Sequence, residues 1–494
     1  MRNLIISLLS LLPFATAAAD NIYDGVPFSM AQVEKPQIPS YTVCITDFGG
    51  KSDGTTLNTE AFRKAMAHLA ENGGGKLIVP AGLWHTGPIE MKSHTELHLE
   101  DGALIVFTAD RSQYPLIDTY FEGVRSRRCM SPLTAHNVTD IAITGRGTIN
   151  ANGQAWRPVK KGKMTAGQWD ALLKEGVTNK KGDVWFPTQD IHDANTDKTL
   201  MENAIKTDTK EAWAKVHDSL RPALLSIVGC KRVMLKDATF ENSPGWNLHP
   251  LMSSDITIED INVRNPWYAQ NGDGLDLESC RNVTVCRAVF DVGDDAICMK
   301  SGRDKEGRDR NMPTENVIVK DCRVYHGHGG FVVGSEMSGG VRNIWVKNCQ
   351  FIGTDIGLRF KSTRGRGGVV ENIFIDGVYM ANMPGDAMTF DLYYAGANPG
   401  NNKAERYKVD ETTPSFRKIS IQNVTILNAK RCAFINGLPE MPVQDIVIKN
   451  SNMSGKEGIY LNCVNRLTLD NVKITAEKTD PVTRTDDTQN ITIR

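Results

Sequence analysis

Apolar residues recur in a short alternating pattern from about residue 231 to the end of the chain. Each copy starts with an apolar lead residue and has further apolar residues two and seven positions later. Alternation with a period of two, rich in Val and Ile, is typical of β-strands and does not fit the 3.6-residue period of a helix. The lead residues are Val233, Ile256, Val283, Val317, Ile344, Ile373, Ile419, Ile446 and Leu467.

A second feature of the repeat is Asp or Asn four positions after the lead residue, as at Asp237, Asp260, Asp321, Asn348, Asn423, Asn450 and Asn471. Both residue types tolerate left-handed backbone, so each copy is interpreted as strand, tight bend and strand. Such a unit cannot bury its apolar face alone, and neighbouring units must stack. Most steps between leads are 21 to 34 residues, which suits one coil of a parallel β-helix, and the longer step from Ile373 to Ile419 needs a loop. Weaker copies lie upstream at 97–99 and 141–143.

Two segments depart from this repeat. Near the start, Asn58 or Thr59 is expected to cap a helix that ends before Gly73 and covers the exposed edge of the first coil. Residues from about 156 to 221 are polar, Lys-rich and partly helical in pattern, and we interpret them as an insertion or lid over one end of the groove. We therefore predict an all-β fold over residues 20–494: a single-domain right-handed parallel β-helix (solenoid) with an N-terminal capping helix and an inserted loop region.

Composition narrows the possible partners. The 494 residues are 40% hydrophobic and 23% charged, with a formal net charge of −1, which fits a globular protein. No charge run points to nucleic acid or an anionic membrane as partner, and the oligomeric state stays unknown. Residues 1–19 are typical of a secretory signal, with Arg2 followed by an apolar run too short to span a membrane. We expect an exported protein that is periplasmic or extracellular after signal peptide cleavage.

Ten cysteines in an exported protein would ordinarily favour disulfides. Cys322 and Cys349 fall at the same apolar position in consecutive repeats. This placement fits a stacked pair of free thiols in the core at least as well as it fits a disulfide bond. The sequence alone assigns no disulfide.

Four short segments concentrate charged groups at positions that stacked coils would bring together. Adjacent coils lie roughly 4.8 Å apart, so carboxylates on neighbouring coils repel each other, which should raise the pKa of at least one and place an acid beside bases. Hydrolysis of a glycosidic bond has this requirement, and an inverting enzyme usually keeps its carboxyl groups about 6.5–9.5 Å apart to admit water. The groups are Asp273, Asp294, Asp295, His328, Arg359 and Lys361.

The local context of these groups leads to two further expectations. Gly293 suggests a bulge or bend that lets both Asp294 and Asp295 reach solvent, although another Asp-rich turn would look the same. Arg359 and Lys361 are two apart on an expected strand and so share one face, where Arg364 and Arg366 follow closely. We interpret this cationic face as a site for a substrate carboxylate, whereas an isolated basic pair is more often simply solvated.

In this order and on this repeat, the four segments resemble the polygalacturonase family of glycoside hydrolases (family 28). The usual motifs of that family are Asn-Thr-Asp, Gly-Asp-Asp, Gly-His-Gly and Arg-Ile-Lys. This chain has Asn271-Gly272-Asp273, Gly293-Asp294-Asp295, Gly327-His328-Gly329 and Arg359-Phe360-Lys361. The departures, Gly272 for Thr and Phe360 for Ile, remove no reactive group. The segment 47–50, with Asp53-Gly54 after it, also looks like the entry to this fold, so the resemblance runs from about residue 42 to the C-terminus, the insertion excepted.

The resemblance implies an inverting hydrolase of α-1,4-galacturonosyl linkages in polygalacturonate, with no metal or other cofactor. It implies that Asp294 is the general acid, that Asp273 and Asp295 hold and activate the water, and that His328 tunes the acid. Arg359 and Lys361 would bind the galacturonate carboxylate, and Asn271 and Arg303 are the other candidate substrate contacts. The segments 300–304 and 334–337 look like the bacterial, often exo-acting branch, for which the insertion could close one end of the groove.

Three alternatives stay open. A pectate lyase on a similar β-helix would rely on calcium and an Arg base, and fold alone cannot decide between the two. A hydrolase of rhamnogalacturonan or of another branched galacturonide would carry similar groups. A non-catalytic binder such as an adhesin is the third, and the clustered carboxylates argue against it.

Overall fold

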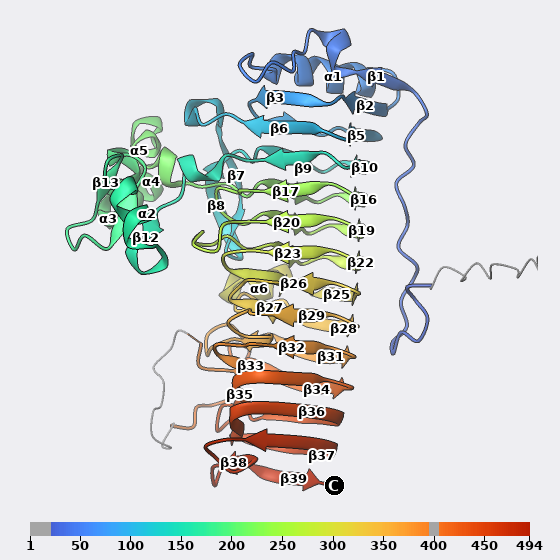
Figure 1. The fold of residues 1–494 in the computed structure, drawn as a ribbon, viewed down its shortest axis with the longest axis vertical. Coiled ribbons are helices and arrows are strands. Elements are labelled where there is room, and N and C mark those ends of the chain that lie inside the picture. Colours follow the sequence, from blue (N-terminus) through green and yellow to red (C-terminus); the bar gives the residue numbers. More distant parts are fainter. Residues whose placement is uncertain (1–20, 395–404) are drawn as a thin grey trace, which may run out of the picture.

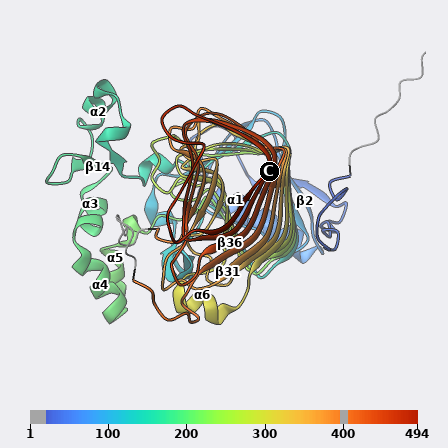
Figure 2. The same cartoon turned by 90° about the horizontal axis from the view of Figure 1, so that it is seen from below.

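The computed structural model describes residues 21–394 and 405–494, and the expected signal segment 1–19 lies outside them. Its strands stack as a right-handed parallel β-helix around one continuous apolar core, which confirms the predicted fold. Figure 1 shows the coils following one another from the N-terminal to the C-terminal end of the stack, and Figure 2 shows them superimposed when seen along it. Within the described residues, no helix is long and apolar enough to cross a membrane.

The predicted lead residues form one continuous column from Val233 to Leu467, each paired with the lead residue of the next coil. The predicted bends are also present, since Asp237, Asp260 and Asp321 have φ of 66°, 58° and 58°, in the left-handed region. The strands of this first line are β16 (Lys231–Lys236), β19 (Ser254–Glu259), β22 (Arg281–Cys286), β25 (Thr314–Lys320), β28 (Val341–Lys347), β31 (Val369–Asp376), β34 (Ser415–Gln422), β36 (Val443–Asn462), β37 (Val464–Ala476) and β39 (Gln489–Ile493).

Upstream coils continue the same line. Ile141 pairs with Val233 and extends the lead column, whereas Leu97 pairs with Ile143, so the position aligned with the leads on that coil is Thr95. The polar lead explains why this copy of the repeat is weak. The upstream strands of the first line are β1 (Thr42–Cys44), β2 (Gly75–Val79), β5 (Thr95–Leu99) and β10 (Thr139–Thr144).

Two further lines of strands complete each coil. The second line consists of β3 (Gly82–Thr86), β6 (Ala103–Phe107), β11 (Thr148–Asn150), β17 (Thr239–Glu241), β20 (Asn262–Arg264), β23 (Val289–Asp291), β26 (Arg323–Val324), β29 (Gln350–Ile352) and β32 (Tyr379–Ala381). The third consists of β4 (Ile89–Glu90), β9 (Leu133–His136), β15 (Leu225–Val228), β18 (Leu248–Leu251), β21 (Leu275–Glu278), β24 (Asp295–Lys300), β27 (Gly329–Val333), β30 (Leu358–Lys361), β33 (Asp386–Asp391) and β38 (Val482–Arg484), and β35 (Thr425–Asn436) pairs with both β32 and β33. The loops between the second and third lines, together with the outward face of the third line, carry the charged motifs.

Helix α1 (Thr59–Glu71) covers the first coil as predicted and buries its apolar face there. The predicted cap is wrong in detail. Asn58 occupies the N-cap position, but its side chain accepts a hydrogen bond from the N–H of Lys51 at 2.7 Å and donates to the carbonyl of His85. The hydroxyl of Thr59 accepts from the N–H of Gly87. Both side chains therefore hold the neighbouring loops in place and leave the helix end uncapped.

The insertion folds into a small helical unit rather than a loop. It contains α2 (Ala166–Leu172), α3 (Gln189–Thr196), α4 (Lys198–Thr207), α5 (Lys210–Ala214) and a three-stranded sheet of β12 (Val159–Lys160), β13 (Val177–Thr178) and β14 (Val184–Phe186). Tryptophans organise its two apolar clusters, one around Trp156 and Trp213 and the other around Trp169 and Trp185. Figures 1 and 2 place it beside the stack, next to the hairpin of β7 (Leu116–Phe121) and β8 (Val124–Cys129).

All ten cysteines are free, and nine of them are buried. Cys322 and Cys349 lie on consecutive coils, because the residues around them pair in register. Burial raises the pKa of the Cys322 thiol well above its usual range, so these stacked thiols pack as small apolar side chains.

The core beneath the Arg-Phe-Lys motif generates a stability prediction. Phe360 is fully buried and stacks on Phe390 with 4.6 Å between ring centroids. Phe360→Ala should lower the free energy of unfolding by about 3–5 kcal/mol, because it leaves a cavity in a packed core. Urea unfolding followed by circular dichroism measures the loss, with Tyr379→Ala at the 37% exposed Tyr379 as control. Equal losses in the two variants would contradict this description of the core.

Candidate active site

Three carboxylates converge at the start of the third strand line on two adjacent coils. Asp273 lies shortly before β21, and Asp294 and Asp295 stand at the start of β24, which pairs with β21. One oxygen from each carboxylate lies within 4.8 Å of the others. Their exposure differs sharply: the Asp294 side chain is 21% exposed, the Asp295 side chain 1% and Asp273 as a residue 3%. Asp294 is therefore the carboxylate of the three that a bulky ligand can reach.

The expectation that Gly293 lets both Asp294 and Asp295 reach solvent is wrong. A Cβ at Gly293 would lie 2.5 Å from the carbonyl oxygen of Ala269 and 2.7 Å from that of Pro266. The glycine is thus required by the close approach of the preceding loop. It leaves Asp294 at the surface, while Asp295 turns inward to meet cations from a later coil.

Asp295 is held by the two cations of β30. Its carboxylate accepts hydrogen bonds from Arg359 Nη1 at 3.1 Å and from Lys361 Nζ at 2.6 Å. The coil between them contributes Gly329, which pairs with Asp295 and has no side chain to block the path. Burial opposes ionisation of Asp295, but Lys361, Arg359 and then Lys300 outweigh it and hold the pKa of this carboxyl well below its usual range.

Asp273 has the opposite environment. Burial raises its pKa well above the usual range, and repulsion from Asp276, Asp294 and Asp295 adds to the effect. Asp276, also fully buried, has its pKa raised by burial as well, with Lys300 opposing the shift. The cluster therefore keeps a proton beside the ionised Asp295, and this proton belongs to the coupled carboxylates together rather than to one of them.

His328 joins this cluster to the insertion. Its Nδ1 lies 3.2 Å from Asp294 Oδ1, and its Nε2 lies 3.2 Å from Lys163 Nζ. An ammonium group can only donate, so in this contact Nε2 accepts and the imidazole proton is on Nδ1, facing Asp294. Asp355 lies 3.8 Å from Nε2 on the following coil. The insertion thus contacts the histidine that faces Asp294.

The two other predicted substrate contacts have different surroundings. Asn271 Oδ1 accepts a hydrogen bond from Arg221 Nη2 at 2.9 Å, and Arg221 also donates to the carbonyl of Gln270, so this pair fixes the loop that carries Asp273. Arg303 lies against the tip of the β7–β8 hairpin, 3.6 Å from Glu122. Within the described residues, Arg303 forms no ion pair with the three clustered carboxylates.

The additional cations expected beside Arg359 are engaged elsewhere. Arg364 binds Glu440 through two hydrogen bonds, and Arg366 Nη1 lies 2.5 Å from Asp304. The cationic face at the site is therefore built from Arg359 and Lys361. Tyr394 packs over this pair, with its ring centroid 4.9 Å from Lys361 Nζ.

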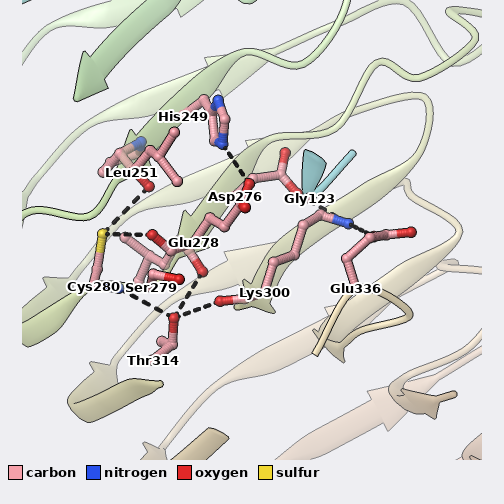
Figure 3. A network of polar contacts seen from close by, with 12 residues as sticks. Gly123, His249, Leu251, Asp276, Glu278, Ser279, Cys280, Lys300, Thr314 and Glu336 are labelled. Carbon is pink, nitrogen blue, oxygen red and sulfur yellow. Dashed lines mark hydrogen bonds and ion pairs between the residues drawn. The ribbon is translucent and has the colours of Figure 1, made fainter. Parts of the chain in front are cut away.

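A buried charge network supports the cluster from one side (Figure 3). Lys300 Nζ lies 2.9 Å from Glu336 and 3.6 Å from Asp276. Burial disfavours the charge on Glu336, yet Lys300 lowers the pKa of Glu336 to about 2. In the same network Glu278 accepts from His249 at 3.0 Å and pairs with Arg310 at 2.7 Å. Lys300 therefore carries positive charge among the acidic groups that it separates.

Sequence reasoning did not assign some of these groups. Lys300 and Glu336 lie within segments that the family resemblance singled out, so a signal for them existed. Asp276 stands between the core residues Leu275 and Leu277 on β21, so strand alternation would have placed its side chain on the outward face. Lys163 had no such signal, because the insertion does not follow the repeat.

The arrangement matches a known family. Residues 206–415, which include all four motifs, match the profile described as "Glycosyl hydrolases family 28". The chain is 28% identical over 425 residues to "Probable polygalacturonase" of Vitis vinifera, covering 83% of this chain and 74% of that protein. It is 29% identical over 392 residues to "Exo-poly-alpha-D-galacturonosidase" of Dickeya chrysanthemi, covering 77% and 61%.

A solved structure is also similar to this chain over most of its length. The hyperthermoactive exopolygalacturonase from Thermotoga maritima shares 31% sequence identity with this chain, over 90% of this chain and 94% of that one, with a TM-score of 0.75. Fold, motifs and charge arrangement thus agree, and the chain belongs to glycoside hydrolase family 28 and is a glycoside hydrolase.

Proposed function

We propose that this enzyme hydrolyses α-1,4-galacturonosyl linkages of polygalacturonate from a chain end, with inversion at the anomeric carbon. One observation carries the proposal: an accessible carboxylate, Asp294, lies above a buried carboxylate, Asp295, that Arg359 and Lys361 hold ionised. The names of the Dickeya and Thermotoga proteins support the exo-acting form.

Asp294 acts as the general acid in this proposal. It is the exposed member of the cluster, so a glycosidic oxygen can reach it. The Nδ1–H of His328 faces Asp294 Oδ1, and the backbone N–H of Asp295 donates to the same oxygen at 3.0 Å. Both donors stabilise the carboxylate that forms when the proton leaves for the leaving group.

Asp295 acts as the base that accepts a proton from the attacking water. The nearest carboxylate oxygens lie within 4.8 Å of one another, closer than the roughly 6.5–9.5 Å usual for inverting enzymes. The distance between the carboxylates therefore does not by itself indicate inversion. The burial of Asp295 favours inversion instead: with 1% exposure, its side chain cannot approach the anomeric carbon of a bulky ring. Direct attack by the carboxylate is therefore disfavoured.

Recognition of the galacturonate carboxylate is assigned to Arg359 and Lys361. Both already bind Asp295, but guanidinium and ammonium groups retain further donors. Arg359 and Lys361 carry two positive charges against the single negative charge of Asp295. The excess positive charge can attract one more carboxylate. A methyl-esterified sugar would lack that attraction.

The insertion supports attack from a chain end. It stands beside the upper coils in Figure 1, and Lys163 brings it against His328. A wall at this place would admit few sugars on the N-terminal side of Asp294, so the rest of the polymer would run over the later coils.

Product analysis tests this function. Wild-type enzyme on polygalacturonate should release galacturonate or one short oligomer, with a slow fall in viscosity. Asp294→Asn should remain folded and lose about 10²–10⁴-fold in kcat, as expected for removal of a general acid. A mixed oligomer ladder with a rapid viscosity drop would contradict the exo-acting mode. Near-normal turnover by Asp294→Asn would contradict the role of Asp294 as general acid. Release of products only from rhamnogalacturonan or another branched galacturonide would show that this polymer, and not polygalacturonate, is the substrate.

The charge on Lys361 should set the acidic limit of activity. Lys361 lowers the pKa of Asp295, so Lys361→Met should raise that pKa and protonate the base at a pH where the wild type still works. The acidic limb of the kcat profile should move to higher pH, with a lower maximum. Lys347→Met, which changes a lysine beside Trp345, is the control. An unchanged acidic limb in Lys361→Met would show that Asp295 is not the base that titrates there.

Metal independence follows from the same charges. The three carboxylates are close enough to hold a cation, but Arg359 and Lys361 already supply the positive charge that Asp295 needs. We expect full activity in a chelator and products without ultraviolet absorbance. Activity lost in a chelator and restored by calcium, with unsaturated absorbing products, would favour a lyase.

A further inference from the structure

The line of loops that carries Asp294 continues far beyond the catalytic coils. The N–H of His328 donates to the carbonyl of Asp294 at 2.9 Å, and one coil past Asp355 the N–H of Gly385 donates to the Asp355 carbonyl at 2.9 Å. The N–H of Lys430 then donates to the Gly385 carbonyl at 3.1 Å. Lys430 therefore occupies, on a later coil, the rung position that Asp294 and His328 occupy in the active site.

Two more lysines follow on this line. Ala429 pairs with Gly455 and Arg431 with Glu457, which places Lys430 beside Lys456 on the next coil. The N–H of Lys478 donates to the carbonyl of Lys456 at 2.9 Å. We call Lys430, Lys456 and Lys478 the lysine track.

The lysine track is an unbalanced stack of positive charge. All three residues are exposed, and like charges on adjacent strands repel. In the described part of the chain, none of the three forms an ion pair. Glu457, the acidic neighbour, is bound by Arg431 at 2.7 Å and leaves the lysines unneutralised.

The track lines a hollow rather than a flat surface. A cavity of about 490 Å³ is bounded by the three lysines and by Asn382, Met383 and Pro384, among others. A stack of cations that opens into a cavity is suited to a ligand with regularly repeated negative charges.

The position of the track relative to Asp294 follows from the strands. From β24 the third line runs through β27, β30 and β33 to β35, β36 and β38. With coils roughly 4.8 Å apart, Lys430 lies about 19 Å and Lys478 about 29 Å along the stack from Asp294. The track is thus well beyond the sugar that reacts, on the side opposite the insertion.

We propose that the lysine track binds carboxylates of the same polyuronate chain several sugars away from the cleaved bond, on its uncleaved side. This rests on the proposed function, because the insertion would leave the later coils as the path for the polymer. The track would hold a long chain in line with Asp294 between successive cleavages, and short oligomers would not reach it.

Binding measurements in the Asp294→Asn background test the track without turnover. Isothermal titration with polygalacturonate should show about ten-fold weaker binding for Lys430→Ala/Lys456→Ala/Lys478→Ala, as three exposed ion pairs of ordinary strength would give. Digalacturonate, too short to reach about 19 Å, should bind equally with and without the three changes. The loss for the polymer should shrink at high salt, because exposed charges are screened.

The matched control removes the same charge elsewhere. Lys35, Lys51 and Lys473 are exposed and, within the described residues, form no ion pair, so their triple Ala variant changes net charge equally. Polymer binding weakened equally by both triple variants, or digalacturonate binding weakened by the track variant, would overturn the proposal. These outcomes are separate from the proposed function, which fails instead if wild-type enzyme does not cleave polygalacturonate.

Discussion

In-register stacking of coils about 4.8 Å apart is the constraint on which the rest of this structure depends. Each coil places its residues directly over those of the previous coil, so a chemical group that recurs at one position becomes a column. Apolar leads become the core, and Asp or Asn at the bends become a line of left-handed turns. The same stacking forces Asp273, Asp294 and Asp295 together, although repulsion would separate them in a less rigid scaffold.

This enforced proximity explains the chemistry of the site. Buried like charges are tolerated only where opposite charges are interleaved or a proton is retained. Both solutions are present: Lys361 and Arg359 keep Asp295 ionised across the gap left by Gly329, while burial and repulsion keep the pKa of Asp273 high. A protonated carboxyl and an ionised carboxylate thus coexist within one cluster because their surroundings shift the pKa values of Asp273 and Asp295 in opposite directions.

The repeat made much of the fold predictable, since period-two alternation and bend residues specify strands and their stacking without any tertiary information. The motifs likewise predicted which acidic and basic groups would meet. Burial could not be predicted in the same way: whether Asp295 faces solvent depends on a later coil and on the loop packed against Gly293. The insertion was the least predictable part, because Lys163 reaches His328 through a helical unit that follows no repeat.

The central claim is that Asp295, buried and ionised, activates a water molecule and does not itself attack the sugar. The configuration of the first product tests this most directly. Proton NMR recorded immediately after enzyme is added to an α-linked oligogalacturonide should show the β-anomer of the released reducing end before mutarotation mixes the two forms. Initial appearance of the α-anomer would mean retention through a covalent intermediate, and would contradict the role assigned to Asp295.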